Sequence, residues 1–140
     1  MGTMRALLWA GLLACSLPAA ADKPVAPVEI AGAVNVTAEK LVDLFATTPQ
    51  LVMIDSRRQE EFEKGHIEGA FNLLDADMTQ TSLAKLVAEK YTPVLFYCNG
   101  ERCLRSSNAA KLALEWGYHK VYWFRGGWKE WSDKSLPVAK

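Results

Sequence analysis

The sequence contains few of the cysteine and histidine side chains that build zinc sites, with three cysteines and two histidines among 140 residues. One of them, Cys15, lies in a segment that we expect to be removed from the mature chain, which leaves Cys98 and Cys103. Two thiols alone make a poor zinc site, and no further cysteine or histidine pair lies at a spacing that would complete four ligands. We therefore expect neither a metal ion nor another cofactor.

The sequence also lacks a net charge, because 16 basic residues balance 16 acidic ones. This balance gives no electrostatic reason to expect nucleic acid or an anionic membrane surface as a partner. There is no run of like charges, no internal repeat and no low-complexity segment beyond the first thirty residues. The length suits one domain with a single hydrophobic core, and we expect a monomer.

The first residues have the order of a secretory signal peptide. Residues 1–5 are a short basic start, residues 6–17 are apolar and uncharged, and residues 18–21 read Pro-Ala-Ala-Ala. Small residues at this point are typical of a signal-peptidase site, and the apolar stretch is shorter than the roughly 20 residues of a transmembrane helix. We therefore expect removal of residues 1–21 and export to a bacterial periplasm. An alternative is a lipid anchor on Cys15, because Leu-Leu-Ala-Cys before Ser16 resembles a bacterial lipobox.

The rest of the chain alternates between helical and strand patterns. Residues 22–33 are rich in proline and alanine and indicate an extended linker before a domain over residues 34–140. Continuous apolar runs indicate strands that are covered on both faces. Helices are predicted over residues 38–47, 58–64, 81–90 and 106–116 and around Trp128 and Trp131, and strands over residues 51–54, 70–74, 93–97 and 121–124. This alternation predicts an α/β domain with a mainly parallel central sheet and helices on both faces.

The segment after the strand at residues 93–97 is the most informative for function. Cys98 follows this strand, and in open α/β sheets ligands bind at the carboxyl ends of the strands. The next helix begins near Arg105 or Ser106, and its N-terminus attracts anions together with the N–H groups of the loop. Arg102 and Arg105 add positive charge. The expected anion-binding loop consists of Asn99, Gly100, Glu101, Arg102, Cys103, Leu104 and Arg105.

These surroundings favour the ionised form of a thiol. Cysteines at helix N-termini or beside cations have pKa values of about 3.5–7.5, against about 8.5 for a free thiol. We therefore expect Cys98 to be a thiolate nucleophile at neutral pH. Arg125 is expected near the same edge of the sheet, where it would add charge to the pocket.

Three groups of residues form motifs that occur in a fixed order along the chain. The first follows the pattern D-x-R-x3-E-F-x2-G-H-I-x-G-A, the second surrounds Cys98, and the third follows G-Y-x2-V and then G-G-W-x2-W. The residues are Asp55-Ser56-Arg57, Glu61-Phe62 and Gly65-His66-Ile67-Glu68-Gly69-Ala70; then Tyr97-Cys98, Arg105-Ser106 and Ala109-Ala110; and last Gly117-Tyr118, Val121, Gly126-Gly127-Trp128 and Trp131. Together they resemble the rhodanese (sulfurtransferase) domain family over nearly all of residues 34–140.

The resemblance implies a sulfur-transfer cycle on Cys98. Its thiolate takes the outer sulfur of thiosulfate or another donor and keeps it as a persulfide, which a thiophile such as cyanide or a thiol then removes. The implied partners are a small sulfur-containing anion and a thiol or protein acceptor. The match also implies supporting roles for Asp55, Arg57 and Ser106. We expect Asp55 to be structural, capping a helix or holding a loop by hydrogen bonds, and not an acid–base catalyst.

The loop departs from the usual family pattern C-x2-G-x-R-S. Arg105 and Ser106 lie two residues farther from Cys98, and Cys103 is an addition. Related phosphatases and arsenate reductases have enlarged loops with the pattern C-x5-R, whereas this sequence offers C-x6-R through Arg105 or C-x3-R through Arg102.

Cys103 leaves two interpretations open. It resolves a sulfenate or persulfide on Cys98 in a disulfide cycle, or it is a small residue that packs at the start of the helix. Two other functions therefore stand beside the sulfurtransferase. One is a periplasmic thiol–disulfide redox protein that uses Cys98 and Cys103, and the other is a non-catalytic sulfur-carrier or binding module.

Overall fold

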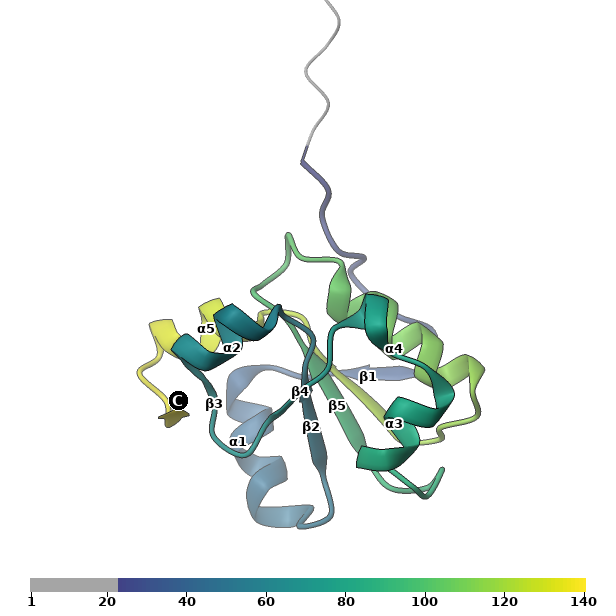
Figure 1. Cartoon of the computed structure of the whole chain (residues 1–140). Coiled ribbons are helices and arrows are strands. Elements are labelled where there is room, and N and C mark those ends of the chain that lie inside the picture. Colours follow the sequence, from purple (N-terminus) through teal and green to yellow (C-terminus); the bar gives the residue numbers. More distant parts are fainter. Residues whose placement is uncertain (1–22) are drawn as a thin grey trace, which may run out of the picture.

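The structure, a computed structural model, describes residues 23–140. Its main sheet has five strands in the order β1-β6-β5-β2-β4, and all neighbouring strands are parallel (Figure 1). The strands are β1 (Ala33–Asn35), β2 (Val52–Asp55), β4 (Phe71–Asn72), β5 (Val94–Tyr97) and β6 (Val121–Phe124). The helices are α1 (Ala38–Thr47), α2 (Gln59–Lys64), α3 (Gln80–Leu86), α4 (Arg105–Glu115) and α5 (Gly127–Asp133), with a 3-10 helix η1 at Asp75–Asp77. The predicted α/β class with a mainly parallel sheet is confirmed.

The main sheet separates two hydrophobic layers, because successive side chains of a strand point to opposite faces. Met53 and Leu95 pack with residues of α1 and α5 on one face. Ile54 and Phe96 pack with residues of α3 and α4 on the other face. This double coverage explains why the sequence of β2 and β5 is apolar without alternation, and it confirms helices on both faces.

The segment expected to be a linker is extended, but it packs against the domain. Ala26 and Ile30 are 3% and 6% exposed and belong to the core layer of α3 and α4. Ala33 begins β1, which pairs with β6, so the folded domain includes residues before position 34. The composition of this segment indicated a linker. It could not show the contacts that bury the segment, because these come from residues that are distant in sequence. The side chain of Arg125, for example, donates to the carbonyl of Pro27 across 98 positions at 2.8 Å.

Two further differences from the predicted elements arise from features that a local sequence pattern does not contain. A second, antiparallel sheet of β3 (His66–Ile67) and β7 (Val138–Ala139) was not predicted, because strands of two residues carry no periodic pattern. The helix predicted over residues 81–90 ends at Leu86. The hydroxyl of Tyr118 donates to the carbonyl of Val87 at 2.7 Å, so a distant residue occupies an acceptor that a further helical turn would need.

The predicted signal peptide at residues 1–21, with Cys15, lies outside the described residues, so export and a lipid anchor stay predictions. Within residues 23–140, no helix combines the length and the apolar character needed to cross a membrane.

We predict that Ile30→Ala destabilises the protein by at least about 2 kcal/mol, because truncation of a buried isoleucine costs about 2–5 kcal/mol. The matched control is Val28→Ala in the same segment. Val28 is 73% exposed, so this change should alter the free energy of unfolding by less than about 0.5 kcal/mol. Urea denaturation followed by tryptophan fluorescence measures both variants. Equally small effects would show that the segment contributes nothing to the core.

Candidate active site

Three neighbouring strands of the main sheet end at the edge that carries the candidate site. β2 ends with Asp55, β5 ends one residue before Cys98, and β6 is followed by Arg125. Cys98 itself is 1% exposed. The loop after it projects from this edge of the sheet and leads back into α4 (Figure 1).

The start of the loop is fixed on the first turn of α5. The N–H of Trp128 donates to the carbonyl of Cys98 at 2.8 Å, and the N–H of Lys129 donates to the carbonyl of Asn99 at 2.9 Å. Gly127 has a φ of +57°, and a Cβ atom at this position would overlap the carbonyl of Cys98. Glycine is therefore needed both for the backbone conformation and for the close approach. These contacts hold the backbone of Cys98 in one position.

Cys98 and Cys103 form a disulfide across the loop, with 6.2 Å between their Cα atoms. This separation lies inside the usual range of about 4.4–6.8 Å. The N–H of Cys103 donates to the carbonyl of Gly100 at 3.0 Å, which closes a turn between the two cysteines. The structure therefore shows Cys103 paired with Cys98. In this oxidised state Cys98 has no free thiolate, so nucleophilic chemistry requires prior reduction of the disulfide.

A cavity of about 600 Å³ lies over the loop. Its charged lining consists of Arg102, Arg105 and Lys129 against Glu101, so the cavity favours an anion. Arg105 and Lys129 have acidic neighbours within 3.8 Å and 2.6 Å, whereas Arg102 has no ion-pair partner among residues 23–140. The cavity lining includes every residue predicted for the anion-binding loop: Asn99, Gly100, Glu101, Arg102, Cys103, Leu104 and Arg105.

The N-terminus of α4 adds partial positive charge at the same place. The helix begins at Arg105 after Leu104, and both residues line the cavity. The first N–H groups of a helix have no partners within it, and the leucine at the N-cap position has no polar side-chain atom to bind them. Ser106, predicted as a supporting residue, is 2% exposed and accepts a hydrogen bond from the indole N–H of Trp123 at 3.0 Å. This bond fixes the start of α4 on β6.

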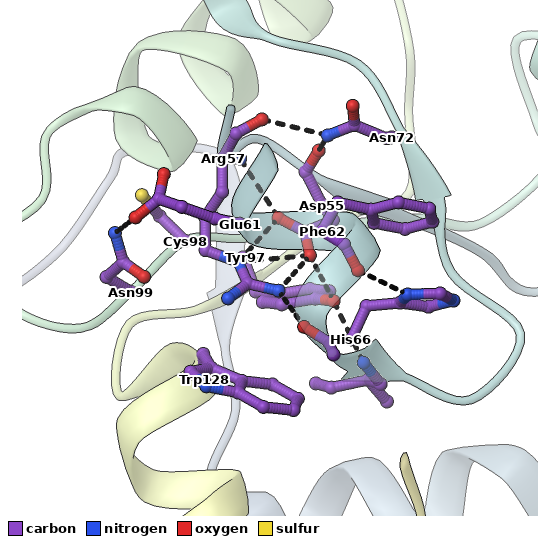
Figure 2. A network of polar contacts seen from close by, with 12 residues as sticks. Asp55, Arg57, Glu61, Phe62, His66, Asn72, Tyr97, Cys98, Asn99 and Trp128 are labelled. Carbon is purple, nitrogen blue, oxygen red and sulfur yellow. Dashed lines mark hydrogen bonds and ion pairs between the residues drawn. The ribbon is translucent and has the colours of Figure 1, made fainter. Parts of the chain in front are cut away.

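A buried polar network joins the strands beneath the loop (Figure 2). Asp55 and Arg57 form an ion pair of 2.7 Å and are 0% and 2% exposed. The hydroxyl of Tyr97 donates to the same carboxylate at 2.6 Å, which links β2 to β5 one residue before Cys98. Arg57 also lies over the ring of Trp128, 4.7 Å from its centroid. The network therefore connects β2, β5 and α5 at the point where the loop begins.

Mutual contacts set the protonation states in this network. Burial and then the charge of Asp55 raise the pKa of Tyr97, so its hydroxyl remains a protonated donor. Burial alone would lower the pKa of Arg57, but the hydrogen bonds and the charge of Asp55 outweigh burial and raise it. Neither Asp55 nor Arg57 belongs to the cavity lining. Their position suits support of the loop rather than proton transfer to a substrate.

Glu61 connects α2 to both ends of the loop. One carboxylate oxygen accepts a hydrogen bond from the side chain of Asn99 at 2.9 Å (Figure 2), and the other lies 3.8 Å from a guanidinium nitrogen of Arg105. Burial alone would raise the pKa of Glu61. The hydrogen bonds from Asn99 and the N–H of Arg58, and the charges of Arg105 and Arg57, outweigh burial and lower it. Sequence reasoning assigned Glu61 no role in the site, and the 38 residues between it and Asn99 leave no local pattern that reveals the contact.

Arg125 does not add its charge to the cavity, contrary to expectation. Its guanidinium donates to the carbonyls of Pro27 and Ala26 at 2.8 and 3.1 Å and pairs with Glu101 at 2.9 Å. The N–H of Ala26 in turn donates to the carbonyl of Glu101 at 2.7 Å. An extended segment presents carbonyls that need donors, and Arg125 supplies them. It therefore ties residues 26 and 27 to the loop.

Lys129 is a cavity residue that sequence reasoning missed. It lies on α5, which follows β6 and therefore starts at the same edge of the sheet as the loop. The prediction of a parallel sheet was the signal that could have found it, because in such a sheet the helices that follow the strands all start at the same edge. Among residues 23–140, no three histidine, cysteine, aspartate or glutamate side chains lie close enough together to hold a metal ion.

Known proteins with similar sequences support one family. Residues 37–134 match the family described as "Rhodanese-like domain". The chain is 30% identical over 90 residues to the uncharacterized protein YibN of Escherichia coli, a match that covers 64% of this chain and 61% of YibN. It is 34% identical over 95 residues to the putative mitochondrial thiosulfate sulfurtransferase of Schizosaccharomyces pombe, covering 59% of this chain and 64% of that protein. The chain thus spans less than two thirds of either relative.

The fold also occurs in solved structures. The crystal structure of thiosulfate sulfurtransferase from Pseudomonas aeruginosa superposes with a TM-score of 0.65 at 21% sequence identity. The superposition covers 76% of this chain and 20% of that chain. At this identity the likeness shows the fold alone.

We predict that Asp55→Asn destabilises the protein by about 3–5 kcal/mol, because it leaves the buried guanidinium of Arg57 without its counter-charge. Tyr97→Phe is the comparison variant. It removes a neutral donor from the same carboxylate and should cost about 1–3 kcal/mol. Chemical denaturation gives both free energies of unfolding. A smaller loss for Asp55→Asn than for Tyr97→Phe would contradict the central place of the ion pair.

Glu61 should make the stability of the protein depend on acid pH. A carboxyl whose pKa is lower in the folded than in the unfolded state stabilises the folded state above its ordinary pKa, and this contribution is lost as the pH falls through the lowered value. We predict that the wild type is more stable than Glu61→Gln at neutral pH and that the difference shrinks below the ordinary value of 4.5. Urea denaturation at a series of pH values measures it. A difference that does not change with pH would exclude ionised Glu61 as its source.

Proposed function

Because the chain belongs to the family of rhodanese-like domains, we propose that it is a sulfurtransferase that moves sulfane sulfur from a small anion such as thiosulfate to a thiophilic acceptor. The sulfur carrier in this proposal is a persulfide on Cys98. The strongest support is the position of Cys98, which follows β5 directly and lies at the base of a loop whose cavity has a cationic lining.

The first step takes place in the reduced protein. The thiolate of Cys98 attacks the outer sulfur of thiosulfate, and a bond forms between this sulfur and Sγ. The bond between the two sulfur atoms of thiosulfate breaks, and its electron pair leaves with sulfite. The donor and the leaving group are both anions, so Arg102, Arg105 and the N-terminus of α4 stabilise the reaction electrostatically.

The second step regenerates the thiolate. A thiophile such as cyanide or a thiol attacks the outer sulfur of the persulfide, the bond to Sγ breaks, and its electron pair returns to Cys98. The cysteine thus divides the transfer into two displacements, as covalent catalysis generally does. The same positive groups stabilise the sulfur anion on Cys98 in every state of the cycle.

A second candidate function rests on the disulfide. A thiol–disulfide redox protein would exchange the Cys98–Cys103 bond with the dithiols or disulfides of a partner. The two candidates differ in one requirement. The sulfurtransferase needs a donor of sulfane sulfur for each turnover, whereas the redox protein oxidises a dithiol with its disulfide alone.

We predict that the reduced wild type forms thiocyanate from thiosulfate when cyanide is in large excess, and that Cys98→Ser lowers the initial rate by about 10³-fold or more, the scale of losses for removed nucleophiles. The oxidised wild type is the matched control, because it has the same sequence and no free thiolate on Cys98. It should be inactive until it is reduced. Circular dichroism checks that Cys98→Ser is folded. Full activity in folded Cys98→Ser would contradict the proposal.

A further inference from the structure

We propose that Cys103 is an internal resolving thiol, which attacks the persulfide on Cys98, forms the observed disulfide and releases the outer sulfur as hydrogen sulfide. The inference rests on the proposed function, because it needs a persulfide on Cys98. With this step, the net reaction is the reduction of the outer sulfur to sulfide and no longer its transfer to an acceptor. Thiosulfate and the two protein thiols would yield sulfite, sulfide and the Cys98–Cys103 disulfide.

The bonds and electrons of this step balance without a further reactant. The thiolate of Cys103 attacks Sγ of Cys98, and the new bond is the disulfide. The bond between Sγ and the outer sulfur breaks, and its electron pair leaves with that sulfur as hydrosulfide. Over the net reaction, the outer sulfur is reduced by two electrons, and the two cysteine sulfurs lose these two electrons when they form the disulfide. The proton from the Cys103 thiol passes to the outer sulfur, so that this sulfur leaves the persulfide anion as hydrosulfide and not as S²⁻.

The disulfide shows that Cys103 can reach the atom that it must attack. The two cysteines are five positions apart, and their Cα atoms are 6.2 Å apart. The turn between the N–H of Cys103 and the carbonyl of Gly100 brings the second thiol back toward the first. The backbone of Cys98 is held on α5 at the same time. A thiol positioned in this way acts at an effective concentration that free thiols do not reach.

The exposure of the two cysteines also favours attack by Cys103 over attack by an external thiol. Cys98 is 1% exposed and does not belong to the cavity lining, whereas Cys103 is partly exposed and does. In the oxidised state Cys103 therefore stands between Cys98 and the cavity. An external thiol that enters the cavity meets Cys103 before it meets Cys98.

The same arrangement indicates how the disulfide is reopened. The reductant that the cycle requires is a dithiol, either a small molecule or a protein with two neighbouring thiols. Its thiolate would attack the sulfur of Cys103, because Cys103 lines the cavity and Cys98 does not. Cys98 then leaves as a thiolate next to the N-terminus of α4, and a stabilised thiolate is the better leaving group. Reduction through Cys103 therefore returns Cys98 directly to its reactive form.

A purely structural disulfide is the simpler alternative, and two observations argue against it. The bond closes a loop of only a few residues, and short loops gain the least stability from a cross-link. It also consumes the thiol that the chemistry of the proposed function requires. A reversible disulfide that forms during the proposed reaction is compatible with the short loop and with the use of the Cys98 thiol.

The test is a single turnover of the reduced full-length mature chain with thiosulfate, after removal of the reductant and without any other acceptor. Sulfite, sulfide and the intact mass of the protein are measured. For the wild type we expect sulfite and sulfide in equal amounts and a protein that ends as the disulfide without added sulfur. For Cys103→Ser we expect the same sulfite, loss of sulfide release, and one retained sulfur. Cys98→Ser should release neither product.

The outcomes separate the inference from the function on which it rests. If wild type and Cys103→Ser both release sulfite and both retain the sulfur, the proposed function stands and the role of Cys103 as a resolving thiol is wrong. If neither releases sulfite from thiosulfate and neither gains sulfur from polysulfide as a second donor, the proposed function is wrong. The wild-type result is decisive even if Cys103→Ser does not fold. A stable persulfide on the wild type is enough to show that Cys103 does not resolve it.

Discussion

The buried ion pair between Asp55 and Arg57 is the interaction on which the candidate site depends. Two charges without solvent contact are tolerated when each has a close partner and further hydrogen bonds. Here the carboxylate also accepts from Tyr97, the residue before Cys98, and the guanidinium lies over Trp128, whose N–H holds the carbonyl of Cys98. The pair therefore fixes the backbone of Cys98 from two sides. Rigid support of this kind holds a nucleophile in one orientation, which lowers the entropic cost of reaching the geometry of attack.

Much of the fold could be predicted because its signals are local. Apolar runs predicted β2 and β5, and a helical pattern predicted α1. The loop after Cys98 was identified residue by residue, because a strand, a short polar segment and a helix follow one another. What could not be predicted depends on long-range pairing. The burial of Ile30, the contacts of Arg125 and the link from Glu61 to Asn99 all join residues that no sequence window contains. The pairing of Cys103 stayed open because the spacing permits both a disulfide and simple packing.

The disulfide gives the site two chemical states that exclude each other. In the oxidised state Cys98 is bonded to Cys103 and the cavity holds no nucleophile. In the reduced state of the proposed cycle, Cys98 carries a free thiol at the base of the loop, and the cationic lining of the cavity would bind the anionic donor. If Cys103 resolves the persulfide by forming the disulfide with Cys98, each turnover passes from the second state to the first, and a dithiol resets it. The extra cysteine would then decide the product of the reaction, and the cavity would decide the donor.

The most direct test of this account follows the outer sulfur itself. The reduced wild type is mixed with thiosulfate that carries a sulfur isotope at the outer position, the reaction is stopped by alkylation after increasing times, and the peptide of Cys98 is examined by mass spectrometry. The account predicts that the isotope appears first on Cys98 and is then lost as labelled sulfide while the disulfide forms. Sulfite release without the isotope ever appearing on Cys98 would contradict it.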